Sequence, residues 1–388
     1  MFVAEDMYQL GSQRSAIREL FEYGKQRAAV VGAENVYDFS LGNPTVPAPD
    51  CVNETIRDLT HKLDSISLHG YTSAQGDIET RQAIADYLNK TYETAFSADN
   101  FYLTMGAAAS LSVCFRALTT SPEDEFITIA PFFPEYRVFV EANGAKLVVV
   151  PPHTSDFQID FEALEKAISA HTKGVIINSP NNPSGAVYSK ETIRKLAALL
   201  TKKSEENGTP IFILADEPYR EIAYDGVEVP YMTKYYANTL VCYSYSKSLS
   251  LPGERIGYVI VPVYAAIAGA GRALGYVCAP SMFQKVIAAC VGNTGDIELY
   301  KKNRDLLYDG LTKIGYECFK PQGAFYMFVK ALEPDADAFC ERAKDQDLLI
   351  VSATGFGCPG YARVSYCVDY DMIERSFLAF EKLYQSYR

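Results

Sequence analysis

Three short apolar runs constrain the fold of this chain more than any other feature. They cover residues 174–178 and 211–215 and, more weakly, 240–243. Each run is continuous rather than alternating, which predicts a strand buried on both faces of a parallel sheet. An amphipathic stretch at 189–202 separates the first two runs. This alternation of strand and helix predicts an α/β fold.

The length of 388 residues allows about two or three domains and a core large enough for a deep ligand cleft. The Ala- and Gly-rich stretch at 265–275 suggests a break near 265–285. We therefore expect an N-terminal arm with part of a small domain at 1–47, a large domain at 48–275 and a small α+β domain at 276–388.

Composition narrows the function classes. A net charge of −12 argues against a surface for nucleic acid or anionic membranes. The nine cysteines form no C-x-x-C pair and the four histidines lack metal-ligand spacing, so we expect free thiols, no metal and a reducing cytoplasm. The first twenty residues lack a signal-peptide core, and no apolar window is long enough to span a bilayer. We expect a soluble cytoplasmic protein.

Lys247 is the candidate catalytic residue. It ends the run Tyr-Ser-Tyr-Ser-Lys after the third apolar run, and Arg255 follows eight residues later. Hydroxyl donors and a fixed positive charge suit a phosphate. A lysine beside a phosphate site can form a Schiff base with pyridoxal phosphate, whereas most lysines are merely solvated. With few histidines, lysine is also the obvious proton carrier.

Two loops that follow predicted strands could contact such a cofactor. Residues 104–110 start a helix with small residues, which lets a phosphate approach backbone N–H groups, although plain packing is the commoner reason for such residues. Residues 131–136 place Phe132 and Phe133 on a proline-flanked loop, where a ring could lie against a planar cofactor. A hydrophobic plug is the alternative there.

Polar residues also follow the first two apolar runs. Asn182 comes after the first, and Asp216 and Tyr219 come after the second. Ligands of α/β sheets bind in the crevice at the carboxyl ends of the strands. A carboxylate there needs a cation, and the protonated pyridine nitrogen of pyridoxal phosphate is one. A helix-capping aspartate with a surface tyrosine is the alternative.

The order of these motifs is small-residue loop, aromatic loop, Asn-Pro-x-Gly, Asp-x-x-Tyr, then Ser-x-Ser-Lys with a later arginine. From about residue 42 to 363, it resembles the class I/II aminotransferases of the fold-type I pyridoxal-phosphate enzymes, which are aspartate aminotransferase-like. The resemblance implies a mostly parallel central sheet covered by helices in a large cofactor-binding domain. It also implies a smaller α+β domain built from the N- and C-terminal segments, and a homodimer.

The resemblance implies cofactor-binding roles. Lys247 would hold the cofactor covalently and shuttle the proton, and Asp216 would pair with the pyridine nitrogen. Asn182 and Tyr219 would bond the phenolic oxygen of the ring. The phosphate would be held by the backbone of Ala107 and Ala108, the hydroxyls of Ser244 and Ser246, Arg255, and Tyr71 of the partner subunit.

Other roles concern stacking and substrate. Phe133 would stack on the ring, with Phe132 the less favoured choice. Arg363 would grip the substrate α-carboxylate by a bidentate pair, Gly42 would let the backbone approach that carboxylate, and Asn182 would also contact substrate.

One position departs from the family pattern. At the position of Ala108, relatives often carry a side chain that also touches the phosphate. The alanine predicts reliance on backbone N–H groups and Arg255.

The implied reaction moves the amino group of an L-amino acid to a 2-oxo acid, commonly 2-oxoglutarate. Aspartate and aromatic donors are both open. Aspartate would need a second cation, for which Arg14, Arg18 and Arg272 are candidates, while the many tyrosines and phenylalanines could line an aromatic-tolerant pocket.

Two other functions use the same parts. A carbon–sulfur β-lyase of this fold would release pyruvate and ammonia without a 2-oxo-acid acceptor. A non-catalytic regulator or scaffold with this fold would have no need of Lys247.

Overall fold

The computed structural model describes residues 2–12 and 16–388. The chain forms two compact units, and the N- and C-terminal segments together build the smaller one. The larger unit comprises Val46–Ile297 and Gln322–Ala324, and the smaller comprises Met1–Thr45, Glu298–Pro321 and Phe325–Arg388.

These bounds differ from the expected ones at residues 276–297, which belong to the larger unit and not to a C-terminal domain. Helix α12 (Ser281–Cys290) contacts other helices of the larger unit and buries Phe283, Val286 and Ile287 in its core. The Ala- and Gly-rich stretch before it is no linker either, because it forms helix α11 (Tyr264–Ala273), which packs on the same unit. Of its small residues, Ala270 and Gly271 are buried.

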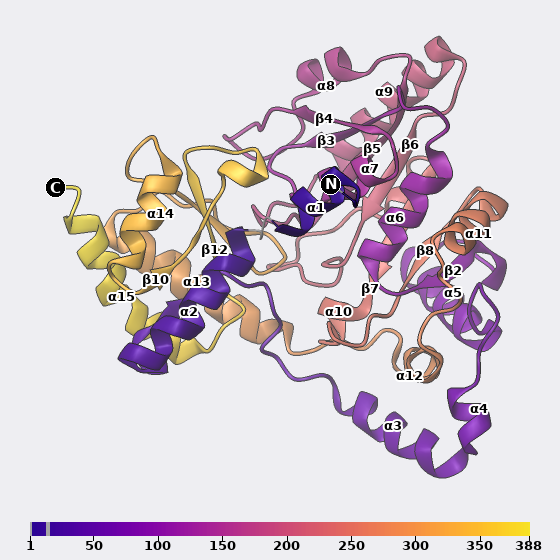
Figure 1. The fold of residues 1–388 in the computed structure, drawn as a ribbon, viewed down its shortest axis with the longest axis horizontal. Coiled ribbons are helices and arrows are strands. Elements are labelled where there is room, and N and C mark those ends of the chain that lie inside the picture. The colour runs from indigo at the N-terminus through magenta and orange to yellow at the C-terminus, as the bar shows by residue number, and fades with distance from the viewer. Residues whose placement is uncertain (1, 13–15) are drawn as a thin grey trace. The chain divides into compact units, whose positions relative to one another are not determined.

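A seven-stranded sheet organises the larger unit, in the order β2-β8-β7-β6-β5-β3-β4 (Figure 1). Strand β8 is antiparallel to both neighbours and every other pair is parallel, which confirms a mostly parallel sheet. The three apolar runs became β5, β6 and β7 at its centre. The strands are β2 (Phe101–Thr104), β3 (Glu125–Ile129), β4 (Lys146–Val150), β5 (Thr172–Asn178), β6 (Phe212–Asp216), β7 (Thr239–Ser244) and β8 (Gly257–Ile260).

Helices cover both faces of this sheet, as expected. Residues of α6, α7 and α11 join one core cluster, and residues of α3, α5, α8, α9 and α12 join the other. These helices, with two shorter ones, are α3 (Asp50–Lys62), α4 (Ser65–His69), α5 (Ile78–Tyr92), α6 (Ala107–Leu118), α7 (Glu135–Ala142), α8 (Phe161–Ala167), α9 (Lys190–Asn207), α10 (Tyr245–Ser248), α11 and α12.

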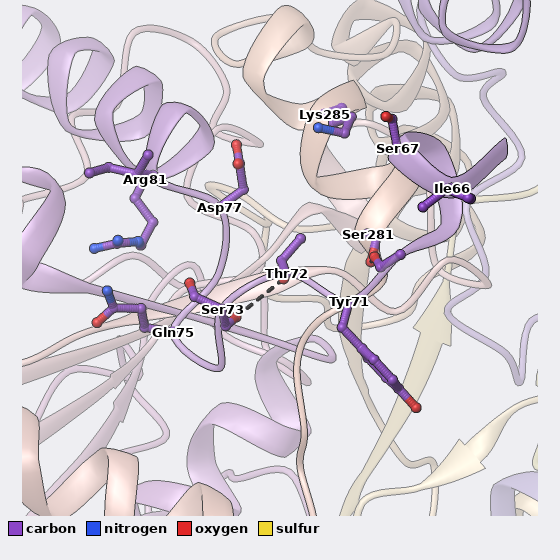
Figure 2. Close-up of a pocket in the computed structure, with 12 residues that line it drawn as sticks. Ile66, Ser67, Tyr71, Thr72, Ser73, Gln75, Asp77, Arg81, Ser281 and Lys285 are labelled. Carbon is purple, nitrogen blue, oxygen red and sulfur yellow. Dashed lines mark hydrogen bonds between the residues drawn. The ribbon is translucent and has the colours of Figure 1, made fainter. Parts of the chain in front are cut away.

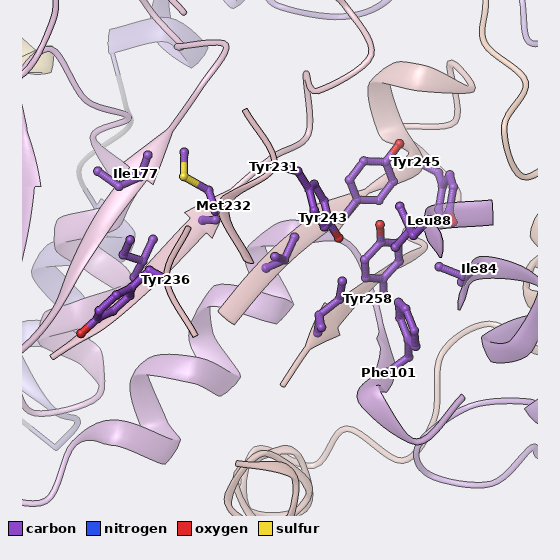
Figure 3. Close-up of a cluster of buried hydrophobic side chains, with 14 of the residues drawn as sticks. Ile84, Leu88, Phe101, Ile177, Tyr231, Met232, Tyr236, Tyr243, Tyr245 and Tyr258 are labelled. Atoms are coloured by element: carbon purple, nitrogen blue, oxygen red, sulfur yellow. The ribbon is translucent and has the colours of Figure 1, made fainter. Parts of the chain in front are cut away.

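The alternation along β7 separates the two cores. Val241 and Tyr243 enter the cluster beneath α5 and α9, which we call the α9-side core, and Leu240 and Cys242 enter the opposite α6-side core. Successive side chains of a strand point to opposite faces, so each central strand feeds both cores. The α9-side core is rich in tyrosine; Figure 3 shows Tyr243, Tyr245 and Tyr258 close to one another within it.

The smaller unit is α+β, which confirms the expectation. It contains an antiparallel sheet β11-β12-β9 and a parallel pair β1-β10. No helix in the described part of the chain is both long and apolar enough to cross a membrane. The elements of the smaller unit are α1 (Glu5–Ser12), α2 (Ala16–Val31), β1 (Tyr37–Asp38), α13 (Ile297–Ile314), β9 (Tyr326–Lys330), α14 (Ala336–Lys344), β10 (Leu348–Leu349), β11 (Val351–Ser352), β12 (Tyr361–Ser365) and α15 (Tyr370–Gln385).

Candidate active site

Strand register brings the predicted cofactor residues of the larger unit to one edge of the sheet. Asn178, Asp216 and Cys242 lie side by side on β5, β6 and β7. Ser244, two residues beyond Cys242 on β7, pairs with Gly257 on β8, and Gly257 also pairs with Thr104 on β2. The carboxyl ends of the parallel strands therefore carry the motifs, which is where α/β sheets bind ligands.

Asp216 is the most perturbed carboxyl group at this edge. Its side chain is buried, and Tyr136 Oη donates a 2.5 Å hydrogen bond to Oδ2. Burial disfavours the charged form and raises the pKa of Asp216 to about 7, although the tyrosine bond acts in the opposite direction. A carboxyl group held in this way is ready to accept a cationic partner.

Two residues that the motif analysis missed make hydrogen bonds that hold Asp216 in place. One is Tyr136, and the other is Asn178, whose Nδ2 donates to the Asp216 carbonyl oxygen at 2.8 Å. Asn178 Oδ1 in turn accepts from the backbone N–H of Asn182 at 2.7 Å. Both had a local signal, since Tyr136 ends the Pro-Phe-Phe-Pro-Glu-Tyr run and Asn178 ends an apolar run.

The ring-contacting candidates are buried to different degrees. Asn182 and Tyr219 are both buried at this edge. Phe132 is a buried member of the α6-side core, whereas Phe133 is only half-buried and packs edge-on against Tyr136, with centroids 5.8 Å apart. Of the two phenylalanines, only Phe133 keeps surface that a ligand could cover.

Lys247 lies on α10, a single helical turn directly after β7. Ser244 begins the turn by accepting the backbone N–H of Ser246 at 3.2 Å. The hydroxyls of Ser244 and Ser246 are 2.7 Å apart, and both are buried. The Lys247 side chain is half-buried. The lysine thus occupies a fixed turn at the sheet edge.

The predicted phosphate site joins the start of α6 to Arg255. The Arg255 guanidinium donates to the Pro252 carbonyl at 3.0 Å and to the Met105 carbonyl at 3.2 Å. A Cβ at Gly106 would lie 2.8 Å from Arg255 Nη2, and Gly106 has φ +88°, so only glycine fits beneath this arginine. Ala107 and Ala108, the first residues of α6, are partly exposed beside it.

Tyr71 lies away from these groups in the described chain. Its side chain is 87% exposed, and Figure 2 shows its ring pointing away from the other residues of the surface pocket that it helps to line. Ile66 and Ile78 of the same pocket are also strongly exposed.

Arg363 lies on β12 of the smaller unit. It is buried, its Nη2 donates to the Ser40 carbonyl at 2.5 Å, and its guanidinium lies 4.7 Å from the Tyr326 ring centroid and 5.0 Å from that of Phe356. Gly42 has a local steric role, because a Cβ there would collide with Tyr326 Oη.

The three candidates for a second cation are less informative. Arg18 and Arg272 are exposed, and Arg14 lies outside the described residues. The nine cysteines are free thiols.

Comparison with known proteins identifies the family to which a chain with this fold and site belongs. The model of the family "aminotransferase class I and II" matches residues 33–378. The chain belongs to this family, and it is an aminotransferase: an enzyme that moves an amino group from an amino acid to a 2-oxo acid.

Among curated relatives, the probable N-acetyl-LL-diaminopimelate aminotransferase of Bacillus subtilis is 30% identical over 88% of this chain and 87% of that protein. The aspartate aminotransferase of Thermotoga maritima is 29% identical over 92% and 93%. An amino transferase of Eubacterium rectale with a solved structure is 71% identical, with a TM-score of 0.99 over the whole of both chains. The comparisons favour amino-group transfer over β-elimination.

Proposed function

We propose that this aminotransferase binds pyridoxal phosphate at the sheet edge of the larger unit and uses Lys247 as its catalytic base. The observation that carries the proposal is the buried Asp216 carboxyl group at the carboxyl end of β6. Asp216 pairs in register with Asn178 on β5 and with Cys242 on β7, and Cys242 precedes Ser244 by two residues. Burial raises the pKa of Asp216 to about 7, so its charged form would gain from a cationic partner such as a protonated ring nitrogen.

The residues present fit this cofactor. Asp216 would face the ring nitrogen, and Arg255, whose guanidinium lies against Gly106 and Met105 at the start of α6, would hold the phosphate. The Ser244 and Ser246 hydroxyls and the backbone of Ala107 and Ala108 would complete the phosphate site. Around the ring, Asn182 and Tyr219 would bond the phenolic oxygen, and Phe133 would stack.

Pyridoxal phosphate supplies an electron-accepting ring that stabilises the carbanion left when an amino acid loses its Cα proton. The chain's own residues do the rest. Lys247 Nζ would act as the base that takes the Cα proton and would later return it. Arg363 would hold the substrate α-carboxylate with its planar fork, and Asn182 would add a substrate contact. Asp216 would stabilise the positive charge on the ring nitrogen.

Replacing Lys247 by alanine tests this assignment. We expect transamination to fall by at least about a thousandfold, because both the covalent tether and the proton carrier are lost. Borohydride should then attach the cofactor to wild-type protein only, as read by mass spectrometry of the Lys247 peptide. An unchanged thermal midpoint would show that the variant folds, and substantial turnover by a folded variant would refute the role.

For the donor, we propose aspartate or an aromatic amino acid, with 2-oxoglutarate as acceptor. Relatives carry the names aspartate, aspartate/prephenate and aromatic-amino-acid aminotransferase. A panel of amino donors, followed by stopped-flow conversion of the bound cofactor to its pyridoxamine form, would decide between them. Arg363→Lys should raise the KM of every donor about ten- to a hundredfold, because an ammonium cannot form the bidentate fork. An unchanged KM would argue against Arg363.

We also propose that the enzyme is a cytoplasmic homodimer in which Tyr71 serves the partner's phosphate site. Free thiols suit a reducing compartment, and the exposure of Tyr71 together with Ile66 and Ile78 suits a surface that another copy covers. Mixing Lys247→Ala subunits with Tyr71→Ala subunits should restore activity, because one hybrid site then holds both intact residues. Failure of mixed dimers to regain activity would contradict the exchange.

A further inference from the structure

A buried polar network on the face opposite Asp216 links the segments that carry the proposed active-site residues. Its centre is Arg220, a fully buried arginine of the turn after β6. Arg220 Nη1 donates to Glu217 Oε2 at 2.9 Å, and Nη2 donates to Tyr258 Oη at 3.0 Å. Both Nε and Nη2 lie 3.3 Å from Glu221 Oε1.

Tyrosine rings enclose this guanidinium. The Arg220 Cζ atom lies 4.3 Å from the Tyr243 ring centroid and 5.4 Å from those of Tyr92 and Tyr231. Tyr243 also stacks on Tyr258 at 4.9 Å, within the aromatic group of Figure 3. A planar guanidinium that donates to carboxylates while its faces contact rings can occupy few positions, so it fixes the elements around it.

The network reaches α10 through one hydroxyl. Tyr243 Oη donates to Glu221 Oε2 at 2.9 Å and lies 2.8 Å from Ser248 Oγ. Ser248 is the residue after Lys247, and its backbone carbonyl accepts the N–H of Gly295 at 2.8 Å. One hydroxyl thus joins the turn that carries Tyr219 to the helix that carries Lys247.

Three network residues each follow a proposed cofactor residue directly in the sequence. Glu217 follows Asp216, Arg220 follows Tyr219 and Ser248 follows Lys247 in the sequence. Tyr243 belongs to the α9-side core, whereas Tyr136, the partner of Asp216, belongs to the α6-side core. These groups can therefore act on the active site through the backbone.

We propose that Arg220, Glu221 and Tyr243 are positioning residues that hold the Lys247 helix in register with the Asp216–Tyr219 segment, an inference that rests on the proposed function. Their effect falls on the step in which the Lys247 amine condenses with the cofactor's aldehyde. In that step a carbon–nitrogen double bond replaces the carbonyl, and the oxygen leaves as water. Register sets how closely Nζ approaches the aldehyde carbon.

Tyr243→Phe is the decisive variant, because it keeps the ring and removes only the bridging hydroxyl; Glu221→Gln is the second. The matched control is Tyr236→Phe. Tyr236 Oη also lies in the α9-side core, but it donates to the Ile211 carbonyl at 2.6 Å and lies 3.3 Å from Ser204 Oγ, outside the network.

Three quantities are measured on each apoprotein: the rate of covalent capture of pyridoxal phosphate, the affinity for pyridoxamine phosphate, and the thermal midpoint. Pyridoxamine phosphate cannot condense with a lysine, so it reports the binding pocket alone. We expect Tyr243→Phe and Glu221→Gln to slow capture about tenfold, the effect of losing a hydrogen bond to a charged group, while pyridoxamine phosphate affinity changes less than about twofold. Tyr236→Phe should change neither the capture rate nor the affinity for pyridoxamine phosphate.

Capture at the wild-type rate in both network variants would overturn the proposal, as would slowing that Tyr236→Phe matches. Loss of cooperative unfolding in both network variants would also overturn it, because the network would then serve the fold as a whole. Covalent capture by Lys247→Ala would instead refute the proposed function. The two failures are therefore distinguishable.

Discussion

Two ionisable residues four positions apart, Asp216 and Arg220, are buried on opposite faces of the same sheet edge. Arg220 has carboxylate oxygens at 2.9 and 3.3 Å and three aromatic rings around it. Asp216 accepts a tyrosine hydrogen bond at 2.5 Å, and burial raises its pKa to about 7.

We interpret this difference as one between a structural charge pair and the proposed ligand site. Removing one member of a buried network of charges leaves the others uncompensated, which is strongly destabilising. Burial raises the pKa of Glu217 to about 7 as well, but Glu217 is paired with Arg220, whereas Asp216 is bonded to the neutral Tyr136 hydroxyl, which suits it to the cation that we propose. Substitutions on the two faces should therefore have opposite signatures.

The largest effect on stability should come from Arg220→Met. We expect it to lower the free energy of unfolding of the apoprotein by about 3–5 kcal/mol, because Glu217 and Glu221 lose their buried counter-charge. Guanidinium denaturation measures it. Arg137→Met is the control, since its ion pair with Glu141 is solvent-exposed and should contribute less than about 1 kcal/mol. An equal loss of unfolding free energy in both variants would contradict the contrast between buried and solvent-exposed ion pairs.

Asp216→Asn should show the reverse pattern. Its kcat/KM should fall about 10²- to 10³-fold, as expected when one charge that stabilises the reacting state is lost. The apoprotein should be no less stable than wild type at pH 8, because the variant buries no carboxylate. Steady-state kinetics and denaturation on the same preparation give both values. An apoprotein destabilised as strongly as Arg220→Met would place Asp216 with the structural charges.

The pH dependence of apoprotein stability gives a finer test. The pKa of Asp216 rises from 3.8 to about 7 on folding. Between these values the folded state keeps a proton that the unfolded state has lost, so stability should fall as pH rises from about 4 to 7 and then level off. Asp216→Asn should flatten part of this slope. Some slope should remain, because burial also raises the pKa of Glu217 to about 7. Identical slopes in both proteins would contradict the buried ionisation.

Tyr136→Phe should have the smallest effect. Without the hydroxyl, the pKa of Asp216 rises further, and the carboxylate stabilises a ring cation less well. We expect kcat to fall about fivefold, the effect of roughly one hydrogen bond. Tyr188→Phe is the control, since Tyr188 is equally buried and its pKa is raised by burial alone. A Tyr136→Phe enzyme with wild-type kcat would show that the hydroxyl does not tune Asp216.

Local pattern was enough to predict the central strands. The runs at 174–178, 211–215 and 240–243 became Thr172–Asn178, Phe212–Asp216 and Thr239–Ser244, because continuous β-branched stretches suit strands covered on both faces. The motif residues after these runs reached one sheet edge for the same reason, since parallel strands share their carboxyl ends. The sequence did not predict the strand order or register, but it did predict that these motifs share one edge of the sheet.

Contacts between distant segments were decided by the tertiary structure. The bond between Tyr136 and Asp216 spans 80 residues, and α12 joins the larger unit by packing its apolar face on that unit's helices. The Arg220 network depends on tyrosines from β7, β8 and α5 that no local pattern brings together. Sequence determined which residues are buried on strands and which chemistry follows them, because those properties are local. Folding alone decided that Arg220 is paired with Glu217 while Asp216 is bonded to Tyr136, because those contacts depend on what packs against each residue.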